Sequence, residues 1–336
     1  VIIGLNILTG LLYTPYMLRC LGQNEYGLYS LVASVITYLT LLDFGFGSAI
    51  VRYTARIRAV GTKAQEWNLY GMFATAYVAI GILAGIGGVA LYANVDRLFD
   101  STMNAADMQQ ARVMMALMAG NLALTFPLSI FGSIVTAYER FIFARSLSIL
   151  RILLSTAVLI AVLALGFKAI ALVVVQTIFS LGTLLLNMWY CLCRLKIKIT
   201  FGHFDMALLK EIIVFSWWNF LGAIVDRIYW GTGQFVLGAV SGTVAVAIFS
   251  LAISLQSMYM SMSISLSSVL LPRLTSMVAR NEDQSAISNL FIRTGRLQFA
   301  VLAMILAGFI VFGHAFITLW AGSDYDESYY VALIFF

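Results

Sequence analysis

Charged side chains that interrupt long apolar segments are the residues of this sequence whose chemistry is most informative. Asp43 interrupts one such segment, Asp226 and Arg227 are neighbours within another, and Arg151 lies within a third. A charge at the centre of a bilayer costs roughly 2.5 kcal/mol or more, so each of these groups needs a cavity or a charged partner. Groups of this kind are typical of sites that bind or translocate polar and charged solutes.

Asp226 and Arg227 cannot satisfy one another if the segment 212–238 is a helix. Adjacent residues on a helix point about 100° apart, so the two side chains face different directions. We therefore predict that this helix borders a polar interior and that both residues bind substrate. The alternative is that each residue forms a salt bridge with another helix and has no role in binding.

Arginine predominates among the basic residues. The chain has fifteen arginines and five lysines, and only the planar guanidinium can bind phosphate oxygens through two parallel hydrogen bonds. We predict that Arg52, Arg56, Arg151 and Arg273 bind substrate through a phosphate or pyrophosphate group. The alternative for Arg52, Arg56 and Arg273 is that they only orient the chain in the membrane and contact lipid phosphates. Arg151 is an exception, because it lies about two turns inside the fifth span.

Two glycines, Gly45 and Gly47, lie two and four residues after Asp43. Glycine allows a helix to bend or loosen, and a carboxylate beside the bend could exchange partners or bind a coupling cation. We predict a coupling or gating role for these three residues. The alternative is that Asp43 caps a helix or pairs with Arg52 or Arg56.

The sequence gives no indication of covalent catalysis or of a resident metal. His203 and His314 are isolated from any paired acid, and the three cysteines, Cys20, Cys191 and Cys193, lack metal-ligand or disulfide spacing. Phosphate-binding loops, zinc motifs and nucleophile elbows do not occur in the sequence. We expect no catalytic residue, no metal and no cofactor, with H⁺ or Na⁺ as the candidate coupling ion.

The composition assigns the chain to the membrane proteins. Apolar residues make up 62% of the 336 residues and charged residues only 10%, whereas a soluble globular domain has about 25% charged residues. A helix needs about 20 apolar residues to cross the hydrocarbon core, so the spans can be predicted directly. They are Val1–Leu18, Tyr26–Tyr53, Leu69–Tyr92, Val113–Tyr138, Phe143–Phe167, Ala169–Leu192, Ile212–Gly238, Thr243–Leu271, Leu297–Trp320 and a tenth from Tyr329. In the third span, the spacing of Gly81 and Gly85 predicts close packing against another helix.

The basic residues predict the orientation of these spans. Fifteen of the twenty lie in or beside the links after spans two, four, six and eight, and four lie in the opposite links. Basic links stay in the cytoplasm. We therefore expect a multi-pass protein of the plasma (inner) membrane with a cytoplasmic amino terminus.

The two halves of the chain resemble one another. Leu21-Gly22 matches Leu237-Gly238, Leu83-Ala84-Gly85 matches Leu306-Ala307-Gly308, and the offset stays between 216 and 224 residues. Because the shift covers six spans, an even number, both copies have the same orientation. We predict an all-α protein with two six-helix lobes in parallel repeat around a central cavity. The lobes are residues 1–195 and 211–336, joined by a cytoplasmic linker at 196–210. The second lobe is incomplete, and we expect about two to three further spans in the natural chain.

Three motifs carry a resemblance to a known family. They are P-x-M-L-x-x-L-G-x-x-x-Y-G-L-Y-S-L at residues 15–31, Y-L-x-L-L-D-F-G-F-G-S-A-I-V-R-Y at 38–53, and A-Y-E-R-F at 137–141. Together with the span pattern, they resemble the polysaccharide-export flippases, of the O-antigen and teichoic acid type, of the multidrug/oligosaccharidyl-lipid/polysaccharide (MOP) superfamily. Members of this family typically have twelve to fourteen spans in two lobes around a central cavity.

The resemblance implies a function and a set of partners. Such flippases move undecaprenyl-pyrophosphate-linked oligosaccharide units across the plasma membrane by alternating access, for the synthesis of surface polysaccharide. The implied partners are the lipid-linked oligosaccharide, the lipid bilayer, a glycan polymerase and glycosyltransferases. Nucleic acid is not an expected partner. Three alternatives stay open, namely a cation-coupled multidrug exporter of the same superfamily, a membrane glycosyltransferase or polymerase, and a non-transporting membrane scaffold.

Overall fold

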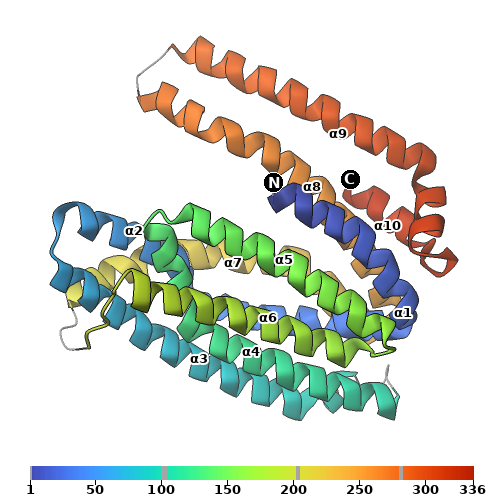
Figure 1. Cartoon of the computed structure of the whole chain (residues 1–336). Coiled ribbons are helices and arrows are strands. Elements are labelled where there is room, and N and C mark those ends of the chain that lie inside the picture. The colour runs from blue at the N-terminus through green and yellow to red at the C-terminus, as the bar shows by residue number, and fades with distance from the viewer. Residues whose placement is uncertain (1, 100–103, 202–204, 280–282) are drawn as a thin grey trace. The chain divides into compact units, whose positions relative to one another are not determined.

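The regular secondary structure of this protein is helical throughout the residues that the computed structural model describes, which are 2–99, 104–201, 205–279 and 283–336 (Figure 1). Eight helical stretches are long and apolar enough to cross a membrane, and the first extends from Ile2 to Val60. The predicted all-α membrane fold is therefore confirmed. The elements are α1 (Ile2–Leu39), η1 (Thr40–Asp43), α2 (Phe46–Val60), α3 (Lys63–Phe99), α4 (Ala105–Ala137), α5 (Phe141–Ala164), α6 (Ala169–Trp189), η2 (Tyr190–Arg194), α7 (Met206–Val240), α8 (Gly242–Ala279), α9 (Gln284–Trp320), η3 (Ser323–Tyr325) and α10 (Ser328–Phe335).

Helix α1 contains two helical segments that meet at Gly22. The backbone of Gly22 has φ 72° and ψ 174°, which lies outside the helical region and in a region that only glycine adopts without strain. The stretch Ile2–Val60 has 59 residues, which at about 1.5 Å per residue is far longer than one crossing of a hydrocarbon core about 30 Å thick. Gly22 lies in the polar segment where the sequence predicts the turn between the first two spans.

The chain forms two compact units. One contains residues 24–246, and the other combines residues 1–23 with residues 247–336. This division follows packing within the described structure and differs from the repeat-based boundaries at 1–195 and 211–336. The division into two lobes therefore remains a prediction from the repeat.

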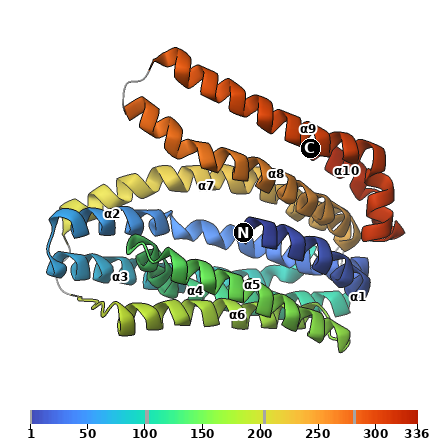
Figure 2. The same cartoon turned by 45° about the horizontal axis from the view of Figure 1, so that its top comes forward.

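In the unit of residues 24–246, the most extensive helix packing is between α3 and α4, which lie side by side along their length in both views (Figures 1 and 2). Small residues allow this approach. A Cβ atom on Gly81 would lie 2.7 Å from the carbonyl oxygen of Ala123, and one on Gly85 would lie 3.8 Å from the Ala123 side chain. The predicted close packing at Gly81 and Gly85 is confirmed, with α4 as the partner helix.

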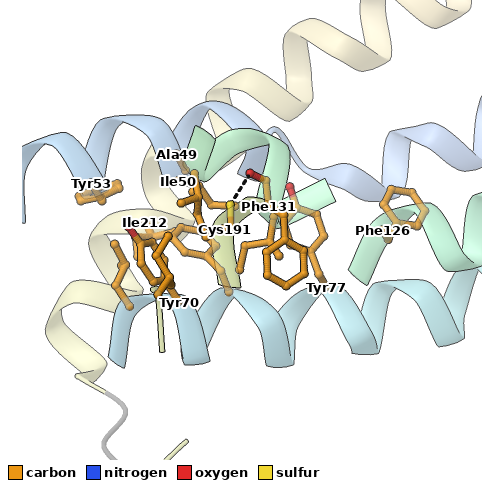
Figure 3. Close-up of a cluster of buried hydrophobic side chains, with 14 of the residues drawn as sticks. Ala49, Ile50, Tyr53, Tyr70, Tyr77, Phe126, Phe131, Cys191 and Ile212 are labelled. Atoms are coloured by element: carbon orange, nitrogen blue, oxygen red, sulfur yellow. Dashed lines mark hydrogen bonds between the residues drawn. The ribbon is translucent and has the colours of Figure 1, made fainter. Parts of the chain in front are cut away.

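A cluster of buried side chains joins five elements of this unit (Figure 3). Tyr53 of α2 and Tyr70 and Tyr77 of α3 are among its largest fully buried members. Cys191 of η2 is also buried, and its thiol donates a hydrogen bond of 3.4 Å to the carbonyl oxygen of Phe131 in α4. This contact explains Cys191 as a packing residue.

Residues 195–200, which we term the strap, follow η2 and lie against α3. The Thr200 amide donates to the carbonyl oxygen of Trp67 at 3.3 Å, and the Thr200 hydroxyl donates to Asn68 Oδ1 at 2.6 Å. Ile197 is buried in the cluster. Part of the predicted linker 196–210 is therefore packed against the helices.

The second unit contains the first segment of α1, most of α8, and α9, η3 and α10. The Trp320 indole donates to the carbonyl oxygen of Leu11 at 2.7 Å, and Arg19 donates to that of Leu319 at 3.1 Å. In α8, the Ser261 and Ser265 hydroxyls donate to carbonyl oxygens four residues earlier in the helix. Such bonds satisfy a hydroxyl within its own helix.

Gly71→Ala should destabilise the protein and release the strap. A Cβ atom there would collide with the Thr200 carbonyl oxygen, a backbone atom that cannot move aside cheaply, and overpacking of this kind costs about 1–3 kcal/mol. Gly85→Ala on the same helix is the matched control, since its Cβ would make only an ordinary contact at 3.8 Å. Thermal unfolding in detergent measures both variants, and equal melting temperatures would show that the strap contact contributes nothing.

Candidate functional site

In the unit of residues 24–246, helix α7 runs antiparallel to the consecutive elements α1, η1 and α2. The contacts that these elements make with α7 and with the start of α8, which we call the seam, join residues far apart in the sequence. From one end to the other they are Gly27 with Thr243 at the start of α8, Leu31 with Gly238, Tyr38 with Thr232, Phe44 with Phe220, Gly45 with Asn219, Tyr53 with Phe215, and Arg56 with Glu211. The seam brings the predicted residues of α2 beside α7.

Asp43 lies at a break in this path. The chain leaves η1 through Phe44 (φ 51°) and Gly45 (φ 71°), both left-handed, before α2 begins at Phe46. Asp43 Oδ1 accepts a hydrogen bond of 3.0 Å from the Tyr77 hydroxyl of α3. The predicted interruption of the helix at this point is present, while the proposed gating role remains a prediction.

The alternative that Asp43 pairs with Arg52 or Arg56 is wrong, because the guanidinium groups of both arginines contact residues of α7. The guanidinium of Arg52 lies over the Phe215 ring, 4.5 Å from its centroid, a favourable cation–π arrangement. Arg56 Nη1 donates to both carboxylate oxygens of Glu211, at 2.9 and 3.1 Å. Both arginines therefore connect α2 to α7.

A cavity of about 660 Å³ opens beside the Arg56–Glu211 ion pair. This volume lies within the range of about 300–1,000 Å³ that is usual for small-molecule sites. The cavity is lined by α2, α3 and the beginning of α7, and its polar lining residues are Tyr53, Arg56, Gln65, Asn68, Asp205 and Glu211. Asp205 caps α7, because its Oδ1 accepts from the amides of Ala207 and Leu208. The basic residues of the sequence predict that this end of α2 and α3 faces the cytoplasm.

Arg151, Asp226 and Arg227 do not line this cavity. Arg151 is exposed on α5, and Asp226 and Arg227 are exposed on α7 beside the equally exposed Val225 and Tyr229. None of the three forms an ion pair with another residue in the described parts of the chain. The side chain of Arg273, also predicted to bind substrate, lies outside the described residues.

Two buried carboxylates were not predicted as functional residues from the sequence. Glu25 is 8% exposed, and it accepts from Lys168 Nζ at 3.1 Å and from the Ala169 amide at 3.2 Å. Glu66 is 3% exposed, and its Oε1 accepts from the hydroxyls of Tyr70 at 2.8 Å and Tyr138 at 2.5 Å. The spacing of Glu66 and Tyr70, four residues apart on one helix face, was the available sequence signal.

The Glu66 contacts explain the tyrosine of the A-Y-E-R-F motif in physical terms. Tyr138, the residue after α4, is bound to α3 through Glu66 and is covered by the Arg58 guanidinium of α2, 3.9 Å from its ring centroid. The Tyr138 hydroxyl is thus a hydrogen-bond donor to this carboxylate. The motif joins α2, α3 and α4 at one end of the unit.

The described residues contain no group of three or more His, Cys, Asp and Glu side chains arranged to hold a metal ion. Hydrogen-bonding and charged groups line the cavity. Arg56 and the amides of Gln65 and Asn68 supply donors, while Glu211 and Asp205 supply acceptors. This combination can bind a ligand that carries phosphate or several hydroxyl groups.

Gly45→Ala should lower the melting temperature more than Gly47→Ala. Gly45 has φ 71°, and a Cβ atom there would lie 2.6 Å from Asn219 Cβ, so the substitution adds both backbone strain and a collision. A Cβ on Gly47 would make only ordinary contacts, the nearest at 3.6 Å from Ser133 Oγ. We expect a difference of about 1–3 kcal/mol, measured by thermal unfolding in detergent. A smaller effect at Gly45 than at Gly47 would contradict the close contact with α7.

Glu66→Ala should destabilise the protein by about 1–3 kcal/mol, because it leaves the buried hydroxyl of Tyr70 and the half-buried hydroxyl of Tyr138 without their acceptor. Glu66→Gln keeps an acceptor oxygen at the same place and should be milder. Chemical unfolding of both variants in detergent provides the comparison. If Glu66→Gln were as damaging as Glu66→Ala, the negative charge rather than the hydrogen bonds would be the stabilising element.

The chain matches a known protein family and a membrane protein of Bacillus subtilis. The family described as "Polysaccharide biosynthesis protein" matches residues 1–278. The protein named "Uncharacterized membrane protein EpsK" from Bacillus subtilis (strain 168) is 21% identical over 338 residues, which cover 96% of this chain and 64% of that protein. The chain thus spans less than two thirds of the length of this curated relative.

Solved structures with the same fold come from the MOP superfamily. An inward-facing multidrug resistance MATE family transporter superposes with a TM-score of 0.73 at 15% identity, covering 99% of this chain and 76% of that one. A MOP superfamily transporter from Pyrococcus furiosus Vc1 (DSM3638) superposes with a TM-score of 0.61 at 15% identity, covering 99% and 74%. At this level of identity the likeness establishes the fold.

Proposed function

Since the chain belongs to the polysaccharide biosynthesis protein family, we propose that it is a flippase that moves lipid-linked oligosaccharide units across the plasma membrane. The substrate we propose is an undecaprenyl-pyrophosphate-linked repeat unit used to make surface polysaccharide. The polyprenyl chain stays in the lipid, and the saccharide crosses through a hydrated space inside the protein. The protein acts as a transporter and carries out no covalent chemistry.

The observation that carries this proposal is the set of charges on bilayer-length helices. Arg151 lies on α5, Asp226 and Arg227 lie on α7, and all three are exposed without an ion-pair partner in the described chain. A charge exposed to hydrocarbon costs several kcal/mol, so such groups border water or a polar solute in the working protein. A channel for a saccharide and its pyrophosphate requires this kind of lining.

The transport cycle that we propose is alternating access. Basic residues at the cytoplasmic ends of the helices, including Arg52, Arg56 and Arg273, attract the pyrophosphate. Two lobes of the protein then rock against one another, which exposes the saccharide to the opposite side. The break between η1 and α2 at Asp43 and Gly45 supplies a hinge, because a broken helix can change direction at low cost. Entry of H⁺ or Na⁺ is the proposed energy source.

A cation-coupled multidrug exporter is the second candidate, and the fold shared with a multidrug resistance MATE transporter favours it. An exporter of cationic drugs needs acids deep in its helices. In this protein Asp43 already accepts a hydrogen bond from Tyr77, and the charges on α5 and α7 include two arginines. This charge pattern favours an anionic substrate.

Arg151→Ala and Arg227→Ala should each abolish surface polysaccharide while the protein remains at normal abundance in the membrane. Truncation removes a cation that a pyrophosphate-bearing solute needs along its path. Arg145→Ala on α5 is the matched control, since Arg145 lies near the beginning of the helix, where a charge reaches water easily. Surface glycan staining and drug susceptibility are measured in the same strains.

The two readouts separate the candidates. Loss of surface glycan with unchanged drug susceptibility supports the flippase. Wild-type glycan with increased drug sensitivity supports the exporter, and wild-type behaviour of both variants in both assays excludes the assigned roles of Arg151 and Arg227.

A further inference from the structure

In the cavity beside α2, α3 and α7, the carboxylate of Glu211 binds the guanidinium of Arg56. Glu211 accepts two hydrogen bonds from Arg56, at 2.9 and 3.1 Å, and both come from the single nitrogen Nη1. The Tyr53 hydroxyl also faces the Glu211 carboxylate. The guanidinium fork therefore keeps its remaining N–H groups for a second acceptor.

The other polar side chains of the cavity present donors. Gln65 Oε1 accepts from the Thr62 amide at 2.8 Å, and Asn68 Oδ1 accepts from the Thr200 hydroxyl at 2.6 Å. These bonds occupy the amide oxygens and leave the two NH₂ groups as donors. Asp205 accepts from the amides at the beginning of α7 through Oδ1 alone. With Glu211 withdrawn, Arg56 and the NH₂ groups of Gln65 and Asn68 would form a cluster of donors for an oxyanion.

We propose that this cavity is a loading site for a phosphate-bearing headgroup, and that Glu211 holds the site closed until phosphate displaces it from Arg56. The inference rests on the proposed function and identifies where the substrate first binds. Guanidinium forks bind carboxylate and phosphate in the same geometry, and phosphate groups carry more charge and more acceptor oxygens. A pyrophosphate can therefore replace the internal carboxylate.

Displacement of Glu211 would also release a contact between helices. The Arg56–Glu211 ion pair is the last contact of the seam, at the end that opens into the cavity. The two side chains are 58% and 48% exposed, so the pair is weak enough for a ligand to break. Binding of the headgroup would free the end of α7 from α2 and thereby couple loading to movement of α7.

The experiment measures binding to the purified full chain in detergent by isothermal titration calorimetry. The probes are inorganic pyrophosphate, farnesyl pyrophosphate and, as a ligand without phosphate, farnesol. Glu211→Gln removes the competing charge and should tighten binding of both pyrophosphates about two- to five-fold, the effect of a partly exposed ion pair. Arg56→Gln should weaken binding about tenfold or more.

Two further variants distinguish competition from a structural effect. The double variant Arg56→Gln/Glu211→Gln should gain less affinity from the loss of Glu211 than the single variant Glu211→Gln does, because it has no Arg56 for which carboxylate and phosphate compete. Arg56→Lys keeps the charge without the fork and should bind with intermediate affinity. Lys63→Gln and Glu139→Gln change exposed charges outside the cavity lining and serve as controls.

The inference is overturned if Glu211→Gln binds pyrophosphate no more tightly than the wild type, or if Arg56→Gln binds equally well while its melting temperature is unchanged. Farnesyl pyrophosphate binding more tightly than inorganic pyrophosphate identifies a lipid headgroup as the ligand, and equal binding identifies free phosphate. Failure here is separable from failure of the flippase proposal, because the glycan phenotypes of Arg151→Ala and Arg227→Ala do not involve this cavity.

Discussion

The hydrocarbon core of a membrane offers no water to charges and open backbone groups, and this constraint explains most of the structure. The backbone meets it by being helical at nearly every described position. Where the helix breaks, at Asp43 to Gly45, the carboxylate is bound by Tyr77 and the turn is packed against Asn219 of α7. A break in a membrane helix is stable only when protein surrounds it, and here α3 and α7 do so.

The same constraint separates two kinds of charge in this protein. Glu25, Glu66 and Arg56 have partners from other helices, and these contacts fix the ends of the bundle. Arg151, Asp226 and Arg227 have no such partner in the described chain. The first kind organises the fold, and the second kind is the basis for proposing transport of a charged solute.

Close approach between helices depends on small residues as much as on charges. Glycines on α3 bring it against α4 and against the strap, and glycines at positions 27, 45 and 238 allow α7 and the beginning of α8 to lie along α1 and α2. Membrane helices gain little from burying apolar side chains, because lipid is already apolar, so contact area between backbones matters more. The fold of this chain is similar to that of a MOP superfamily transporter over 99% of the chain at 15% identity.

The sequence by itself determined the membrane class, the approximate spans, the link between the first two spans, the break beside Asp43, and the packing role of Gly81 and Gly85. These features depend on composition and local spacing, which the sequence contains directly. Only the tertiary structure decided that Arg56 pairs with Glu211, that Arg52 stacks on Phe215, and that Glu66 binds Tyr138. These partners are 155, 163 and 72 positions apart in the sequence, and no local pattern specifies which of several helices packs beside a given charge. The packing of the helices determines those pairs, because each charge bonds to whichever polar group the neighbouring helix places within reach.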